Sequence, residues 1–109
     1  MFTWLNKQGV RSDRGFEVQF TGRFDAEYRE GGRLVKLYVE DGLTDGGLGC
    51  IIVTPDAFVH WEGGAPIPAD QQTQMFQNLR EALEFQGLKL VVESGESPAG
   101  YRVELGDRN

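Results

Sequence analysis

Alternating hydrophobic and polar residues early in the chain predict antiparallel strands. The alternation runs through residues 16–20 and resumes through residues 24–28. Residues 21–23, with glycine at the centre, fit a three-residue hairpin loop between the two runs. This loop predicts a register with three apolar pairs: Phe20 opposite Phe24, Val18 opposite Ala26, and Phe16 opposite Tyr28.

A second hairpin is predicted at Gly31 and Gly32, because both residues of a two-residue turn can then take positive φ. On one face of the hairpin this turn sets Glu27 beside Lys36, an opposite-charge pair across the strands. On the other face it aligns apolar residues in one register: Tyr28 with Val35, Ala26 with Leu37, and Phe24 with Val39.

The middle of the chain predicts a loop and a further hairpin. Residues 41–49 are rich in glycine, and the apolar runs 50–53 and 58–61 follow as two expected strands. Residues 54–57 fit the turn between them, with Pro55 at its second position. This hairpin is apolar on both faces, as expected of strands covered on both sides or of strands that face a partner.

Residues 70–86 predict one amphipathic helix. Asp70 is expected to cap its start and Gly87 to end it. Residues 88–93 then predict a strand that returns to the sheet. One stripe of the helix carries its apolar residues: Met75, Phe76, Leu79, Ala82 and Leu83.

These elements predict an α+β fold, a meandering antiparallel sheet of five to seven strands with one amphipathic helix packed on one face. A chain of 109 residues fits one domain, assigned to residues 1–93, and Trp4 is expected to tie the first strand to its core. Residues 94–109 form a polar extension. Its alternating residues favour an edge strand over a mobile tail: Tyr101, Val103 and Leu105.

The charge is distributed unevenly. Eleven basic and seventeen acidic residues give a net charge of −6, and no Lys or Arg stands between Lys36 and Arg80. This balance argues against nucleic acid and anionic membranes as partners. The acidic stretch between these two residues is interpreted either as a solvated rim that aids solubility or as a surface for a basic partner.

The composition limits location and chemistry. No apolar run approaches the roughly 18–20 residues of a membrane-spanning helix, and the first residues lack the pattern of a secretion signal. Cys50 is the only cysteine, so the reducing cytoplasm is the expected compartment. His60 lacks a neighbouring nucleophile, and residues 41–45 lack the ligand spacing of a calcium loop. We therefore expect no catalysis, no metal site and no cofactor.

Trp61 is open to two interpretations. A tryptophan at a strand end, followed by Glu62 and two glycines, is a common aromatic anchor for a partner. The same indole could instead cover the open end of the core, with Pro66 against it. The sequence favours the structural role.

The order of elements resembles a known family. The residues that carry the likeness are the turn Tyr28–Arg33, Trp61 before a loop with Pro66, the helix positions from Asn78 to Phe85, and the strand ending at Glu93. Over residues 14–93 the chain resembles small immunity proteins of bacterial polymorphic-toxin systems. This resemblance implies a short cytoplasmic protein that binds and neutralises a cognate toxin.

The leading hypothesis is therefore a non-catalytic protein-binding domain, an immunity protein that occludes a basic toxin domain. Two alternatives stay open: a small ligand-binding domain with His60 or Tyr28 in a pocket between sheet and helix, and a homodimer formed through the hairpin of residues 50–61. The expected partner-binding residues combine acidic groups with one indole: Asp41, Asp45, Asp56, Trp61 and Glu62.

Overall fold

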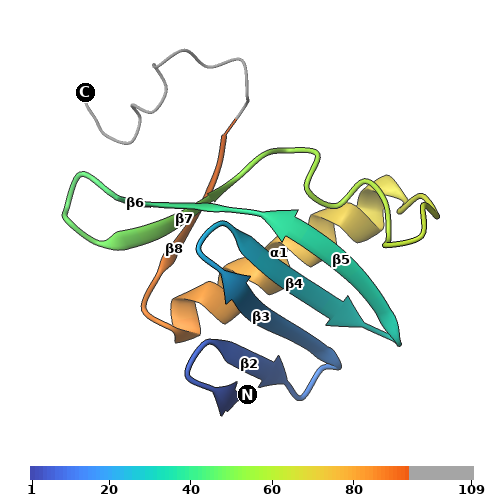
Figure 1. Cartoon of the computed structure of the whole chain (residues 1–109), viewed down its shortest axis with the longest axis horizontal. Helices are drawn as coiled ribbons and strands as arrows, with labels where there is room; N and C mark the ends of the chain where they lie inside the picture. The colour runs from blue at the N-terminus through green and yellow to red at the C-terminus, as the bar shows by residue number, and fades with distance from the viewer. Residues whose placement is uncertain (94–109) are drawn as a thin grey trace.

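The computed structural model describes residues 1–93, which form strands and one helix in an α+β arrangement (Figure 1). The predicted edge strand within residues 94–109 lies outside the described residues. The helix α1 spans Ala69–Phe85. The strands are β1 (Phe2–Asn6), β2 (Gly9–Ser12), β3 (Phe16–Gly22), β4 (Asp25–Glu30), β5 (Arg33–Tyr38), β6 (Glu40–Leu43), β7 (Gly49–Val53) and β8 (Lys89–Val92).

The strands form two sheets where the sequence predicts one. β1 to β5 follow one another in an antiparallel meander, which confirms the predicted architecture of the first half. The second sheet has the order β6-β7-β8, with β6 antiparallel and β8 parallel to β7. The helix connects β7 to β8, as a parallel pair requires.

The predicted hairpin of residues 50–61 is wrong. β7 pairs with β6 and β8, and residues 54–59 form turns and bends instead of a return strand. Its second run contributes only an isolated bridge, between His60 and Pro66. The glycine-rich segment also differs from prediction, because its first residues belong to β6. That strand is nearly all exposed, so it carries little apolar pattern for sequence reasoning to detect.

The hairpin at Gly31 and Gly32 has the predicted register. Both glycines have positive φ, of 62° and 79°, and Glu27 lies opposite Lys36. The apolar pairing on the other face is also confirmed, with Tyr28 opposite Val35.

The predicted register between β3 and β4 is wrong by two residues. The structure pairs Phe20 with Ala26 and Val18 with Tyr28, and Phe16 lies opposite Glu30. The turn is therefore shorter than predicted, and a register shift between Phe20 and Gly22 takes up the extra residue. A shift of two keeps every side chain on its face, so the apolar alternation cannot distinguish the two registers.

The helix confirms the predicted element but not its cap. The segment begins after Pro68, and the Asp70 carboxylate accepts a hydrogen bond from the Gln71 N–H (2.9 Å) inside the first turn. Its negative charge still lies at the helix end that favours anions. Gly87 has φ 84°, the left-handed conformation expected of a residue that ends a helix.

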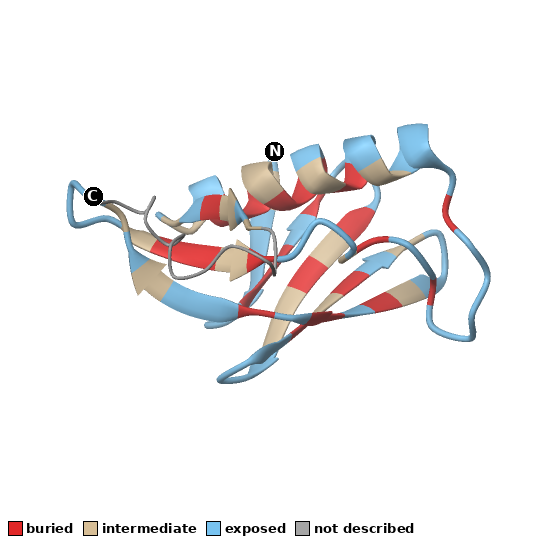
Figure 2. Ribbon diagram, turned by 90° about the horizontal axis from the view of Figure 1, so that it is seen from above, coloured by how far each residue is buried: buried red, intermediate tan, exposed pale blue. Residues whose placement is uncertain are grey.

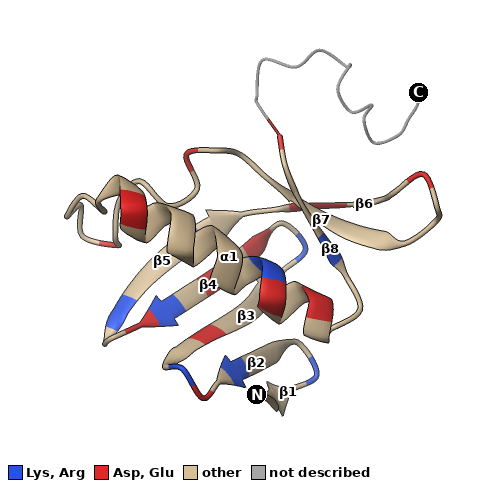
Figure 3. Ribbon diagram, turned by 180° about the vertical axis from the view of Figure 1, so that it is seen from behind, with Lys and Arg blue, Asp and Glu red and all other residues tan. Residues whose placement is uncertain are grey.

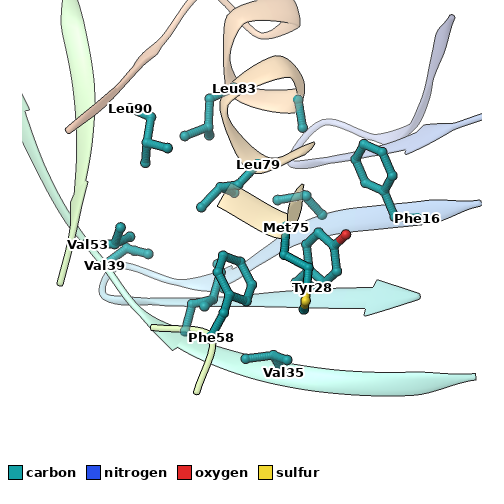
Figure 4. Close-up of a cluster of buried hydrophobic side chains, with 14 of the residues drawn as sticks. Phe16, Tyr28, Val35, Val39, Val53, Phe58, Met75, Leu79, Leu83 and Leu90 are labelled. Carbon is teal, nitrogen blue, oxygen red and sulfur yellow. The ribbon is translucent and has the colours of Figure 1, made fainter. Parts of the chain in front are cut away.

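The core lies between α1 and the two sheets. Figure 2 shows the buried residues of α1 turned toward the strands and its exposed residues turned away. Figure 4 shows side chains from both sheets and the helix meeting in one cluster. Tyr28, Phe58, Met75 and Leu83 are fully enclosed there. No described element covers the other face of the meander.

Contrary to the prediction from the sequence, Trp4 does not tie the first strand to the core. Its side chain is 49% exposed, and its ring centroid is 5.5 Å from that of Phe85 at the end of α1. Phe2, two residues earlier, packs against the core cluster in its place. The first strand is therefore tied to the core by Phe2, with Trp4 outside it.

Candidate functional site

The structure separates the predicted partner-binding residues. Asp41 lies on β6 and Asp45 in the β6–β7 turn, whereas Trp61 and Glu62 lie in the loop before α1. These two loops project at opposite ends of the molecule in Figure 1. Asp56 lies in the turn after β7. Figure 3 shows acidic and no basic segments along the stretch between Lys36 and Arg80. The negative charge of this stretch is therefore spread over the molecule.

Trp61 is a buried residue, with 5% of its surface exposed. The Arg33 guanidinium lies 5.4 Å from the centre of its ring, and the Trp61 backbone N–H donates to the Ala65 backbone carbonyl (2.9 Å). The next residue, Glu62, donates its N–H to the Leu34 carbonyl on β5 (2.7 Å). These contacts fit the structural interpretation of Trp61, since a buried indole offers a partner little surface.

A polar network crosses the interface between α1 and the meander. The Asn78 side-chain amide donates to the Tyr28 hydroxyl (2.8 Å), and that hydroxyl donates to the Glu30 carboxylate (2.6 Å). The Gln74 side-chain amide donates to the side-chain oxygen of Asn78 (3.0 Å). Burial, and then the hydrogen bond to Glu30, raise the pKa of Tyr28 above its ordinary value of 10.0. The phenol therefore keeps its proton and acts as a structural link.

Arg14 extends this network to the β2–β3 turn. It forms an ion pair with Glu81 of α1, it donates to Asn78 (3.4 Å), and its guanidinium lies 5.5 Å from the centre of the Phe16 ring. The sequence pattern did not predict such a role for Asn78 or Arg14. Asn78 carried a signal, however, because it is an amide within the apolar stripe between Met75 and Leu79.

The groups considered for catalysis have different surroundings. His60 is exposed in its bridge to Pro66. Cys50 is buried, and burial raises the pKa of its thiol, which disfavours the reactive thiolate. Among residues 1–93, no group of three or more His, Cys, Asp or Glu side chains is placed to hold a metal ion.

The space between α1 and the sheets is filled by core side chains, including Tyr28 itself (Figure 4). Hollows among the described residues lie elsewhere. One, of about 320 Å³, lies where the β2–β3 and β4–β5 turns meet, with Arg11, Arg29 and Glu30 in its lining. Another, of about 340 Å³, is lined by Arg33 and Trp61 among others. Neither of these two hollows lies between α1 and the sheets, and the ligand-binding alternative stays a prediction.

An exposed aromatic pair stands next to carboxylates at the far edge of the meander. The rings of Phe24 and Tyr38 stack with centroids 6.1 Å apart, and they are 41% and 61% exposed. The Tyr38 hydroxyl donates to the Glu40 carboxylate (3.0 Å), and Asp25 is the cross-strand neighbour of Tyr38. We call these four residues the aromatic corner.

The aromatic corner combines the features that were predicted for Trp61 and its acidic neighbours, an aromatic ring beside carboxylates. Arg23 adds one cation, with its guanidinium 5.2 Å from the centre of the Phe24 ring. The hydrogen bond to Glu40 raises the pKa of Tyr38, so the ring stays neutral at physiological pH. The signal for the aromatic corner in the sequence was Tyr38, an aromatic residue on the same polar side of the predicted strand as Lys36.

Comparisons with protein-family models, with curated proteins and with solved structures give no match to the chain. The resemblance to immunity proteins therefore stays a prediction. Within residues 1–93, no helix has the length and apolar character needed to cross a membrane.

Proposed function

We propose that this chain is a non-catalytic protein-binding domain, an immunity protein that occludes a cognate bacterial toxin in the cytoplasm. It uses no cofactor or metal, and its partner is a basic protein domain rather than nucleic acid or membrane. The observation that carries the proposal is the aromatic corner, where the exposed rings of Phe24, in the β3–β4 turn, and Tyr38, at the end of β5, lie beside carboxylates.

The aromatic corner supplies what a binding hot spot needs. Aromatic side chains bury a large apolar area and lose little conformational freedom when a partner covers them. Tyr38 is held by its stacking on Phe24 and its hydrogen bond to Glu40, so part of its ordering precedes binding. A Lys or Arg of the partner placed over Tyr38 would meet a ring face together with the Asp25 and Glu40 carboxylates.

The acidic stretch supports the same partner at longer range. Its carboxylates are spread along the molecule from the β6–β7 turn to the loop before α1, so they form no single contact surface. Spread charge still steers an oppositely charged partner and accelerates encounter. In this proposal Asp41, Asp45, Asp56 and Glu62 raise the association rate, and the aromatic corner sets the dissociation rate.

The state of the candidate reactive groups supports a non-catalytic role. Cys50 is buried with a raised thiol pKa, and Tyr28 is enclosed with its hydroxyl engaged by Asn78 and Glu30. Neither group is placed to meet a substrate. Occlusion requires an exposed surface for the partner and no reactive group, and in this proposal the aromatic corner is that surface.

The proposal is tested by capturing the partner and measuring its binding. The tagged chain is used to retain proteins from its native cells, and the retained protein is expressed alone and with the chain. We expect a basic protein that is toxic alone and harmless in co-expression. Tyr38→Ala should weaken binding about tenfold or more, mainly through faster dissociation.

Two further variants separate the contribution of the aromatic corner from that of the acidic charge. Leu43→Ala removes an equally exposed apolar side chain outside the aromatic corner, and it should bind as the wild type does. Replacing the acidic residues of the stretch together by amides should slow association and reduce its dependence on salt: Asp41→Asn, Asp45→Asn, Asp56→Asn and Glu62→Gln. Unchanged affinity in Tyr38→Ala would exclude the aromatic corner, and a captured partner without toxicity would exclude the immunity function.

A further inference from the structure

Strand β1 is a free and uncharged sheet edge. It stands at the end of the meander opposite β5, and Phe2–Asn6 contains no acidic or basic residue. Trp4 is 49% exposed and Leu5 37%. Soluble proteins usually protect such an edge with charge, proline or a covering segment, and among residues 1–93 nothing covers this one.

The backbone of β1 is available for pairing. The Met1 carbonyl accepts a hydrogen bond from the Asp13 N–H (3.1 Å), on the side of β2. Because backbone groups alternate sides along an antiparallel strand, Thr3 also faces β2, whereas Phe2 and Trp4 direct their N–H and C=O groups to the free edge.

An aromatic cluster lies along the same edge. Ring centroids are 5.4 Å apart for Phe2 and Phe85 and 5.5 Å apart for Trp4 and Phe85, and Phe85 is 42% exposed. We call Phe2, Trp4 and Phe85 the edge cluster. It joins the strand to the end of α1, so whatever pairs with β1 also meets an apolar surface on the helix side.

We propose that β1 pairs antiparallel with β1 of a second copy of this chain, so that two meanders join into one continuous sheet. A two-fold axis perpendicular to the sheet keeps both α1 helices on the same side, and the two edge clusters then meet. We expect the register in which Thr3 lies opposite Thr3 of the second copy, because it keeps the side chains of each strand on the same face of the joined sheet. This register sets Phe2 opposite Trp4 of the second copy. In this register the free N–H and C=O groups of these two residues face each other.

The charge around β1 favours a second copy as the occupant. The chain is acidic overall, but three carboxylates near this edge form ion pairs. Asp13 is paired with the N-terminal ammonium group (2.8 Å), Glu17 with Arg11 (2.8 Å), and Glu81 with Arg14. Two copies therefore meet less like-charge repulsion along this edge than over the acidic stretch of the chain. A strongly basic partner would find no unpaired acidic group on β1 itself.

The length of the regular edge sets the expected strength. The register between β1 and β2 shifts between Trp4 and Asn6, which limits regular pairing to the first residues of the strand. The edge cluster then contributes most of the buried apolar area. We expect a dimer that dissociates on dilution. It leaves the aromatic corner free, because that surface lies by the opposite edge strand.

The oligomeric state of the full chain tests this proposal. Sedimentation velocity over a concentration series should show a shift from a 12.2 kDa species to one of twice that mass. Trp4→Asp, on the strand, and Phe85→Glu, on the helix, should each raise the dimer dissociation constant at least tenfold. Tryptophan emission should shift to shorter wavelength as the wild type dimerises, because Trp4 becomes covered while Trp61 is already buried.

Matched controls keep the outcome specific. Leu43→Asp places a charge on another exposed apolar residue, in β6, and should dimerise as the wild type does. Circular dichroism should show that the variants are folded. A wild type that stays monomeric at every concentration overturns the proposal, as does a dimer that persists in both edge variants. The toxin-binding test does not depend on either result, because it uses Tyr38.

Discussion

At the scale of single residues, the polar link between Tyr28 and Asn78 is the most specific contact in the core. Tyr28 is fully buried in an otherwise apolar cluster, and its hydroxyl joins α1 to β4 through Asn78 and Glu30. Buried polar groups are costly unless they are paired, so this link favours one placement of the helix on the sheet.

Tyr28→Phe is predicted to destabilise the fold by about 1–3 kcal/mol, because it leaves the buried Asn78 amide without its acceptor. Urea unfolding measures the change. Tyr38→Phe is the matched control, since it also removes a hydroxyl bonded to a glutamate but at a residue 61% exposed. Equal losses in the two variants would contradict the importance of the buried link.

The same residue predicts a dependence on pH. The pKa of Tyr28 is raised in the folded state, so the folded chain retains a proton that the unfolded chain loses above pH 10.0. The contribution of this group is therefore full below that pH and falls as the pH rises further. Unfolding free energies measured across this range should decline less steeply in Tyr28→Phe than in the wild type.

At the scale of elements, the β4–β5 hairpin is defined by its turn. Gly31 and Gly32 both take positive φ, where a side chain is strained, although nothing lies within 4 Å of the position a Cβ would take. The strain is therefore a property of the backbone alone, and packing cannot relieve it.

Gly32→Ala is predicted to cost about 1 kcal/mol, from the left-handed conformation it imposes on alanine. The control is Gly46→Ala, at a glycine that also has open space around it but no positive φ. Thermal unfolding should show a lower midpoint for Gly32→Ala and an unchanged or slightly higher midpoint for Gly46→Ala. The reverse order would exclude this explanation of the turn.

At the scale of the whole molecule, one core joins both sheets through α1. Leu79 and Leu83 lie in the same cluster as Val35 from the meander and as Val53 and Leu90 from the second sheet (Figure 4). The two sheets are therefore expected to unfold together, in a single transition.

Leu79→Asp is predicted to unfold the described domain, because it places an unpaired carboxylate where the side chain is 2% exposed. Circular dichroism and hydrogen exchange should show both sheets losing structure together. Thr73→Asp introduces the same group on an exposed position of α1 and should change stability by less than about 0.5 kcal/mol. A folded Leu79→Asp would contradict the helix-on-sheet core.

The sequence determined the features that depend on local pattern and turn chemistry. These are the α+β class, the meander, the hairpin at Gly31 and Gly32, and the helix, predicted over residues 70–86 and observed over Ala69–Phe85. Each follows from the spacing of apolar side chains along the chain, or from a backbone conformation that few residues other than glycine adopt readily.

Only the tertiary structure decided which segments meet. The partners of β7 lie on either side of it in the chain, and the parallel one follows a whole helix, so no local pattern indicates them. The register of β3 on β4 has two solutions with the same faces. The packing also buries Trp61 and leaves Tyr38 exposed. The exposure of a side chain depends on neighbours that are distant in the sequence. Only the tertiary structure could therefore place the candidate site at Tyr38 rather than at Trp61.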